Sequence, residues 1–249
     1  MTSLILFLAS LWAGAQNALA GGGSFITLPS LMLTGMDARA ANITSTVALF
    51  PAQIVTGWAG RAHVAGAAGL SLRTLILVSL AGGVLGAVLL LYTPSTFFAR
   101  LVPYLVLFAT SVFAWGSFGR KSNPAGRLGR TGAGVAQLLI SVYGGYFGGG
   151  IGFLMLAALT AAGVAIRNAG AIKNVLAAVM NASAVAVFLL SPQVHWRQAV
   201  ITGAGAIAGG LIGSLLMRTI NERALRITIV IIGLALTAGL LYTGSRGVS

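Results

Sequence analysis

Long runs of apolar residues follow one another along almost the whole chain, separated by short polar or glycine-rich breaks. A run of about 20 apolar residues can cross the hydrocarbon core of a bilayer as an α-helix. We expect ten helical segments, at approximately residues 3–19, 22–35, 41–59, 71–92, 97–116, 131–146, 149–164, 171–190, 198–217 and 224–243. The pattern predicts an all-α polytopic membrane protein, because a β-barrel would show alternating polar and apolar positions.

The second half of the chain repeats features of the first half about 127 residues later. The triplet Gly21–Gly23 is matched by Gly148–Gly150, and other matched pairs are Thr46 with Asn174 and Gln53 with Asn181. We expect two repeats of about five segments each, residues 1–116 and 131–249, joined by a polar connection at residues 117–130. An odd number of segments in each repeat makes the two repeats inverted in the membrane.

Two further glycine sets recur at the same offset. Since small residues let helix backbones approach closely in a membrane, we interpret these sets as packing surfaces. Their members are Gly82, Gly83 and Gly86 in the first half and Gly209, Gly210 and Gly213 in the second.

Composition supports the membrane assignment. Hydrophobic residues make up 57% of the chain and charged residues only 7%, with a mean hydropathy of +0.97, whereas a soluble domain carries about 25% charged residues. The net charge of +13 would suggest nucleic acid as a partner of a soluble protein. Here the basic residues lie mostly in short loops, so we interpret them as anchors on the cytoplasmic side, which places residues 117–130 in the cytoplasm and predicts no nucleic-acid partner.

The two glycine triplets adjoin the two shortest segments, residues 22–35 and 149–164. These segments would span about 21–24 Å, less than a hydrocarbon core of about 30 Å. We expect two hairpins of incomplete helices whose glycine tips meet inside the protein and form a central site. A helix that begins at a glycine presents free N–H groups and the positive end of its dipole, which favours an anion. Tight helix crossing is the alternative role for these glycines.

Polar side chains next to the breaks complete the candidate site, with Gln16 and Asn17 before the first triplet and Tyr143 and Tyr146 before the second. The alternative roles are helix–helix hydrogen bonding for the polar residues, snorkelling for Lys173 and helix-end anchoring for the arginines. The candidates for gating or for funnelling anions are Arg39, Arg167, Gln53 and Asn181. The candidates for substrate binding are Gly21, Gly22, Gly23, Ser24, Asn42, Thr44, Ser45, Thr46, Gly148, Gly149, Gly150, Lys173 and Asn174.

Residue types needed for enzyme chemistry are scarce. The chain has no cysteine, its two carboxylates Asp37 and Glu222 lie at segment ends, and His63 and His195 lie near loops. No nucleophile–base pair or metal cluster can be assembled from them. We therefore expect no enzyme activity, no cofactor, no metal and no buried carboxylate as a proton relay.

The first glycine break and the segment after it resemble the sulfite exporter TauE/SafE family, through Gly22-Gly23-Ser24-Phe25-Ile26-Thr27-Leu28-Pro29 and Ala40-Ala41-Asn42-Ile43-Thr44-Ser45-Thr46. Gly148-Gly149-Gly150-Ile151-Gly152 and Lys173-Asn174 add to the resemblance, which covers essentially the whole chain. It implies a bacterial inner-membrane carrier of small sulfur-containing anions such as sulfite, sulfoacetate or other organosulfonates. It also implies about eight membrane spans, fewer than our ten segments.

The function hypothesis is a secondary transporter that exports a small sulfur-containing oxyanion across the bacterial inner membrane. Its partners would be the anionic substrate and the lipid bilayer, and the sequence leaves a homodimer open. A passive anion channel and a carrier of a different small organic anion remain as alternatives. Export of an anion from a negative-inside cell gains about 2.3 kcal/mol per charge per 100 mV, so it needs no coupling carboxylate.

Overall fold

The computed structural model describes residues 2–19, 22–60, 66–118, 128–216 and 222–246, and these residues form ten α-helices. The first five helices are α1 (Thr2–Leu19), α2 (Ser24–Met32), α3 (Ala38–Gly60), α4 (Leu72–Tyr92) and α5 (Ser95–Phe118). The second five are α6 (Arg130–Tyr146), α7 (Ile151–Ala161), α8 (Ile166–Phe188), α9 (Trp196–Leu216) and α10 (Glu222–Arg246). The predicted all-helical class and the ten segments agree with these helices.

Helices α2 and α7 are shorter than the sequence predicted, with 9 and 11 residues. Their lengths are about 14 and 17 Å, roughly half of a hydrocarbon core. The reason lies in the glycines that follow them, because Gly35 and Gly163 have φ values of +92° and +84°. A glycine in this left-handed region ends a helix, and after α7 the N–H of Val164 donates to the carbonyl of Leu159 at 3.0 Å, as in a Schellman motif.

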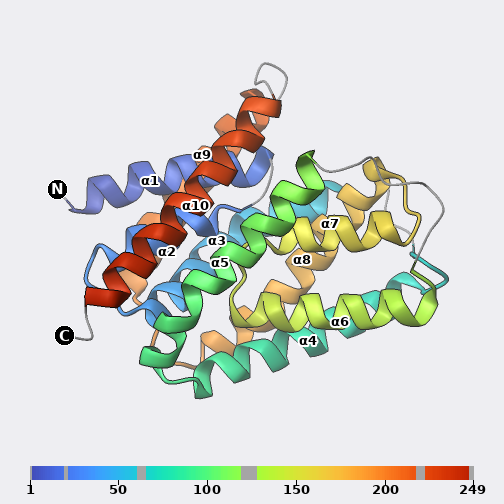
Figure 1. The fold of residues 1–249 in the computed structure, drawn as a ribbon, viewed down its shortest axis with the longest axis horizontal. Helices are drawn as coiled ribbons and strands as arrows, with labels where there is room; N and C mark the ends of the chain where they lie inside the picture. The colour runs from blue at the N-terminus through green and yellow to red at the C-terminus, as the bar shows by residue number, and fades with distance from the viewer. Residues whose placement is uncertain (1, 20–21, 61–65, 119–127, 217–221, 247–249) are drawn as a thin grey trace.

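The two halves of the chain are packed into each other rather than side by side (Figure 1). Helix α1 packs along α9, and its counterpart α6 packs along α4. Likewise α3 contacts α9 while α8 contacts α4, and α2 contacts α10 while α7 contacts α5. The contacts of each half therefore have counterparts in the other, and the matched helices α3 and α8 contact each other directly.

Glycines line both of the pairings between α4 and α6 and between α1 and α9. A Cβ added to Gly86 would lie 2.7 Å from the backbone nitrogen of Tyr146, and one added to Gly213 would lie 2.7 Å from Cα of Ala15. Added Cβ atoms at Gly82 and Gly209 would likewise overlap the neighbouring helix. The predicted packing role is confirmed for these four glycines and for Gly83, which packs on α8, since even a methyl group would separate the helices. At Gly210 an added Cβ would lie 3.9 Å from its nearest neighbour, so this position is not closely packed.

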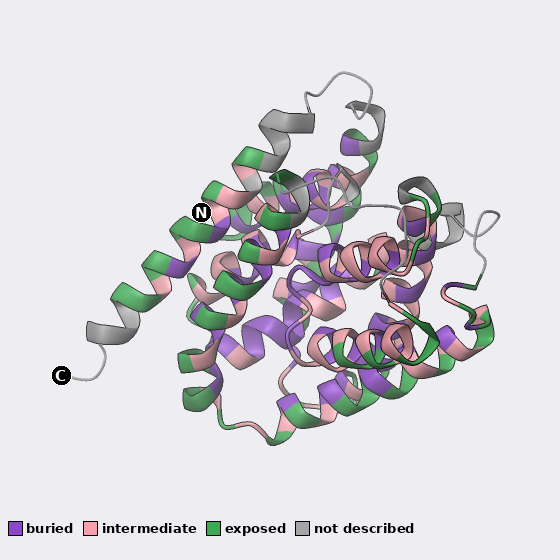
Figure 2. Ribbon diagram, turned by 45° about the vertical axis from the view of Figure 1, so that its right-hand side comes forward, coloured by how far each residue is buried: buried purple, intermediate pink, exposed green. Residues whose placement is uncertain are grey.

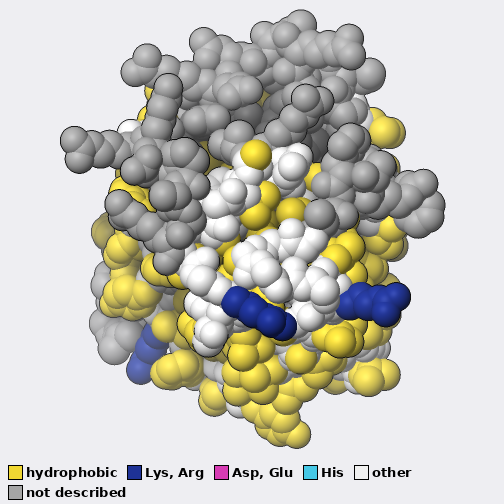
Figure 3. Space-filling view, turned by 90° about the vertical axis from the view of Figure 1, so that its right-hand side faces the viewer, with side chains coloured by type: hydrophobic (Ala, Val, Ile, Leu, Met, Phe, Trp, Pro, Cys, Tyr) yellow, Lys and Arg dark blue, Asp and Glu magenta, His cyan; other side chains and the backbone are white. Residues whose placement is uncertain are grey.

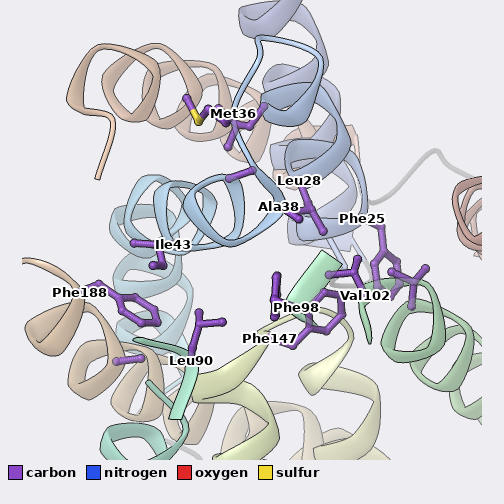
Figure 4. Close-up of a cluster of buried hydrophobic side chains, with 14 of the residues drawn as sticks. Phe25, Leu28, Met36, Ala38, Ile43, Leu90, Phe98, Val102, Phe147 and Phe188 are labelled. Atoms are coloured by element: carbon purple, nitrogen blue, oxygen red, sulfur yellow. The ribbon is translucent and has the colours of Figure 1, made fainter. Parts of the chain in front are cut away.

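A cluster of buried hydrophobic side chains fills the space between α2, α3, α5 and the end of α6. Phe25, Phe98 and Phe147 lie in this cluster together with Leu28 and Val102 (Figure 4). The rings of Phe98 and Phe147 have centroids 6.5 Å apart. This core therefore surrounds the start of α2 and the residue that precedes the second glycine triplet.

Buried residues concentrate on the facing sides of the helices (Figure 2). Many large hydrophobic side chains are exposed, among them Leu77, Tyr104 and Leu139. Hydrophobic side chains cover most of the described part of the face in Figure 3, where Lys and Arg side chains stand apart from one another. Three helical stretches, Leu72–Tyr92, Ser95–Trp115 and Asn168–Phe188, are long and apolar enough to cross a membrane. Such an outer surface matches a lipid environment.

We predict that Gly86→Ala and Gly213→Ala each lower the free energy of unfolding by about 1–3 kcal/mol, because the added methyl group overpacks a helix interface. Thermal unfolding in detergent, followed by circular dichroism, measures the change. The matched control is Gly170→Ala in α8, where an added Cβ meets nothing within 4 Å. Equal unfolding temperatures for Gly86→Ala and the control would contradict the packing role.

Candidate functional site

Each of the short helices begins directly after a glycine break. The backbone at Gly22, Gly148 and Gly150 has φ values of +83°, +77° and +75°, which side-chain-bearing residues rarely adopt. Gly21 lies outside the described residues, and Gly23 and Gly149 are buried. The breaks therefore require glycine for their backbone conformation.

Each glycine break is held by an equivalent hydrogen bond from a side chain of the preceding helix. Nε2 of Gln16 in α1 donates to the carbonyl of Gly22 at 3.4 Å, and the hydroxyl of Tyr143 in α6 donates to the carbonyl of Gly149 at 3.0 Å. In both halves the donor precedes the glycine by six residues. Each glycine loop is thus tied to the helix that leads into it, and one carbonyl in each break is satisfied.

Two phenylalanine rings bring the breaks together. The Phe25 ring in α2 packs on the second break, so that a Cβ at Gly149 or Gly150 would lie 3.0 or 3.3 Å from it. The Phe153 ring in α7 packs on the first break, 3.5 Å from the Cβ position of Gly22. Sequence analysis did not single out these rings, because a phenylalanine within an apolar segment carries no distinguishing pattern.

The second break leaves a row of backbone donors free. No described residue accepts a hydrogen bond from the N–H groups of Gly149, Gly150, Ile151 or Gly152. Together with the dipole of α7 these groups make the start of the helix positive.

The side chain of Lys173 in α8 lies against this same helix start. A Cβ built on Gly152 would lie 3.5 Å from Cδ of Lys173 and 3.6 Å from its Nζ atom. Among the described residues, neither a carboxylate nor a hydrogen-bond acceptor pairs with the ammonium group. The carboxylate of Asp37 accepts hydrogen bonds from the backbone N–H groups of Arg39 and Ala40 at the start of α3. The ammonium group of Lys173 therefore lies beside the positive start of α7.

Polar residues of α3 face both breaks. Nδ2 of Asn42, which is 2% exposed, donates to the carbonyl of Tyr146 at 3.2 Å. The hydroxyl of Thr46 donates to the carbonyl of Asn42 at 2.9 Å and lies 3.7 Å from the Cβ position of Gly148. The hydroxyl of Ser45 pairs with that of Thr27 in α2 at 2.6 Å. Helix α3 thus contacts the N-terminal part of α2 and the C-terminal end of α6.

Other predicted residues lie elsewhere. The hydroxyl of Thr44 accepts the backbone N–H of His195 at 3.2 Å, so it supports the turn before α9. Gln53 and Asn181 are brought together across α3 and α8, where Nδ2 of Asn181 donates to Oε1 of Gln53. Ser24 and Asn174 are half-buried at the start of α2 and in α8, without a hydrogen bond of their side chains to another described residue.

The structure gives Arg39 an anchoring position. Its Nη1 donates to the carbonyls of Thr93 at 2.7 Å and Leu91 at 3.3 Å, at the C-terminal end of α4. A cation at this end of a helix is stabilised by the dipole. Arg167 lies in α8, and its side chain is outside the description. Within the described residues, no group of three His, Asp or Glu side chains could hold a metal ion.

Comparison with known proteins identifies the family of this chain. Residues 6–240 match the family model described as sulfite exporter TauE/SafE. A probable membrane transporter protein ORF9 of Sinorhizobium sp is 32% identical over 95% of this chain and 91% of its own length. A probable membrane transporter protein of Haemophilus influenzae is 29% identical over 96% of this chain and 94% of its length. The probable membrane transporter protein YfcA of Escherichia coli is 28% identical over 96% and 89%. No solved structure matches the chain.

We predict that the hydroxyl pair of Thr27 and Ser45 stabilises the start of α2. A double-mutant cycle of Thr27→Val and Ser45→Ala, measured by thermal unfolding in detergent, should give a coupling energy of about 0.6 to 1.7 kcal/mol. The control cycle pairs Ser45→Ala with Ser30→Ala, whose hydroxyl donates within α2 to the carbonyl of Ile26. Strictly additive effects of Thr27→Val and Ser45→Ala would refute the contact's role.

Proposed function

This chain belongs to the sulfite exporter TauE/SafE family of membrane transporters, and we propose that it is a secondary transporter exporting sulfite or an organosulfonate across the bacterial inner membrane. The single observation that carries the proposal is the Lys173 ammonium group beside the free N–H groups at the start of α7. Like charges this close repel one another in a medium of low dielectric constant. A bound anion would be attracted both to the ammonium group of Lys173 and to the N–H groups at the start of α7.

A sulfite or sulfonate group suits this arrangement chemically. It presents three oxygens that accept hydrogen bonds, and bonds to charged partners are stronger than neutral ones. The N–H groups of Gly149, Gly150 and Gly152 would bind these oxygens, and Lys173 would balance the charge. Thr46 and Asn42 approach from α3, and Gly22, Gly23 and Ser24 approach from the first break. Asn174 lies next to Lys173 on α8 and completes the proposed set.

Transport would arise from an exchange between the two repeats. We assign residues 1–116 and 131–249 to inverted repeats, supported by their matched helix contacts and by the equivalent hydrogen bonds at both breaks. Rocking of one repeat against the other around a site at their interface is the general mechanism for such transporters. The basic connection, residues 117–130, would lie in the cytoplasm and orient a multi-pass protein.

We predict that Lys173→Met reduces sulfite efflux at least tenfold, because a hydrogen bond to a charged group contributes about 1.5–3 kcal/mol. The assay follows efflux from sulfite-loaded proteoliposomes at a set, interior-negative potential. Wild-type efflux should saturate with sulfite and rise as the potential becomes more negative. Arg73→Met, at an exposed cation on α4, serves as the matched control and should retain the wild-type rate.

Two outcomes of this assay separate the parts of the proposal. Failure of the folded wild-type protein to move sulfite would reject this substrate, and the assay would continue with organosulfonates. Equal rates for wild type and Lys173→Met would remove Lys173 from the site.

A passive anion channel is the competing function, because positive helix ends would serve a pore equally well. We expect a carrier, in which unlabelled sulfite on one side drives uptake of labelled sulfite from the other against its gradient. Such counterflow requires a site that is exposed to one side at a time. Labelled sulfite that merely equilibrates, at a rate proportional to its concentration, would identify a channel.

A further inference from the structure

The side chain of Gln16 carries a hydrogen-bond acceptor that no described residue satisfies. The residue is 3% exposed, and its Nε2 atom donates to the carbonyl of Gly22. Its Oε1 atom is fully buried and has no partner among the described residues. The orientation of the amide follows from its neighbour, since the Gly22 carbonyl can accept only from Nε2. The free group next to the first break is therefore an acceptor.

The second half makes the same contact without leaving such a group. Tyr143 occupies the position equivalent to Gln16, and its hydroxyl donates its single proton to the carbonyl of Gly149 at 3.0 Å, with the carbonyl of Leu105 as a second acceptor at 3.3 Å. If a tie to the glycine carbonyl were the only requirement, a tyrosine hydroxyl would meet it in both halves. Gln16 adds a buried acceptor, which is costly while unpaired.

We infer that Oε1 of Gln16 accepts a hydrogen bond from the transported molecule, so that the site selects oxyanions that also carry an O–H or N–H group. Hydrogensulfite and sulfonates with a hydroxyl or ammonium substituent belong to this class. The inference rests on the proposed function. It assigns the anionic oxygens to the start of α7 and the donor end to the first break.

The position of the amide fits this division. A Cβ at Gly22 would lie 3.6 Å from Nε2 of Gln16 and 3.5 Å from the ring of Phe153, which belongs to the first turn of α7. The first break and the Gln16 amide therefore lie against the first turn of α7, next to the proposed anion site. The Lys173 side chain supplies a donor at Gly152, while Gln16 supplies the acceptor at Gly22. The two ends of the site differ in what they recognise.

The test compares 2-hydroxyethanesulfonate with propane-1-sulfonate, which replaces the hydroxyl by a methyl group at nearly equal size. Flux into proteoliposomes is measured for each and corrected with protein-free liposomes. Wild type should favour the hydroxylated substrate by about tenfold, as expected when a site built for a donor meets an analogue that lacks it. Gln16→Met removes the acceptor at similar length and should bring the ratio close to one.

Gln137→Met is the matched control, because it makes the same exchange at another buried glutamine, whose Nε2 atom donates to the hydroxyl of Ser79 between α4 and α6; the wild-type preference should persist. Ligand-induced shifts of the unfolding temperature report binding for every variant, independently of transport rate. A wild type without preference, or Gln16→Met with the wild-type ratio, would overturn this inference and leave the transporter intact. A wild type that neither binds nor moves any sulfonate or sulfite would overturn the proposed function and this inference with it.

Discussion

The rest of the structure depends on one constraint, which is that backbone polar groups exposed by a broken helix cannot be left unpaired in hydrocarbon. The two glycine breaks expose such groups, and the surrounding helices satisfy them selectively. Side-chain donors from Gln16, Asn42 and Tyr143 occupy the carbonyls of Gly22, Tyr146 and Gly149. The N–H groups at the start of α7 have no acceptor in the part of the chain that the structure describes. At the second break, satisfied carbonyls and free N–H groups together make the start of α7 positive.

Close helix packing makes it feasible to keep the breaks inside. The glycines of α4 and α9 let α6 and α1 approach until backbone touches backbone. These two helices carry Tyr143 and Gln16, the residues that hold the glycine loops. Short helices that could not cross a membrane alone are thus enclosed by longer ones, and Phe25 and Phe153 fill the space between them.

Sequence patterns predicted the number and position of the helices, because apolar run length and glycine triplets are local signals. They overestimated α2 and α7, since the role of Gly35 and Gly163 as helix ends depends on a positive φ that composition alone does not indicate. They also grouped Asn42 and Thr44 into one site. Two residues apart on a helix, these side chains point to different neighbours, Tyr146 and His195. The family could be recognised from motifs, but the partner of each polar side chain required the fold.

The bond between Gln53 and Asn181 joins residues at equivalent positions of the two halves. In the proposed exchange of conformation between the halves, a contact made by one half would be converted into its counterpart in the other half. This hydrogen bond would instead be mapped onto itself, so it would lie on the pseudo-twofold axis of the proposed inverted repeats and act as a pivot of the proposed transport cycle. Because one partner is glutamine and the other asparagine, the pivot is itself asymmetric, and the inward-facing and outward-facing states need not be equal in energy.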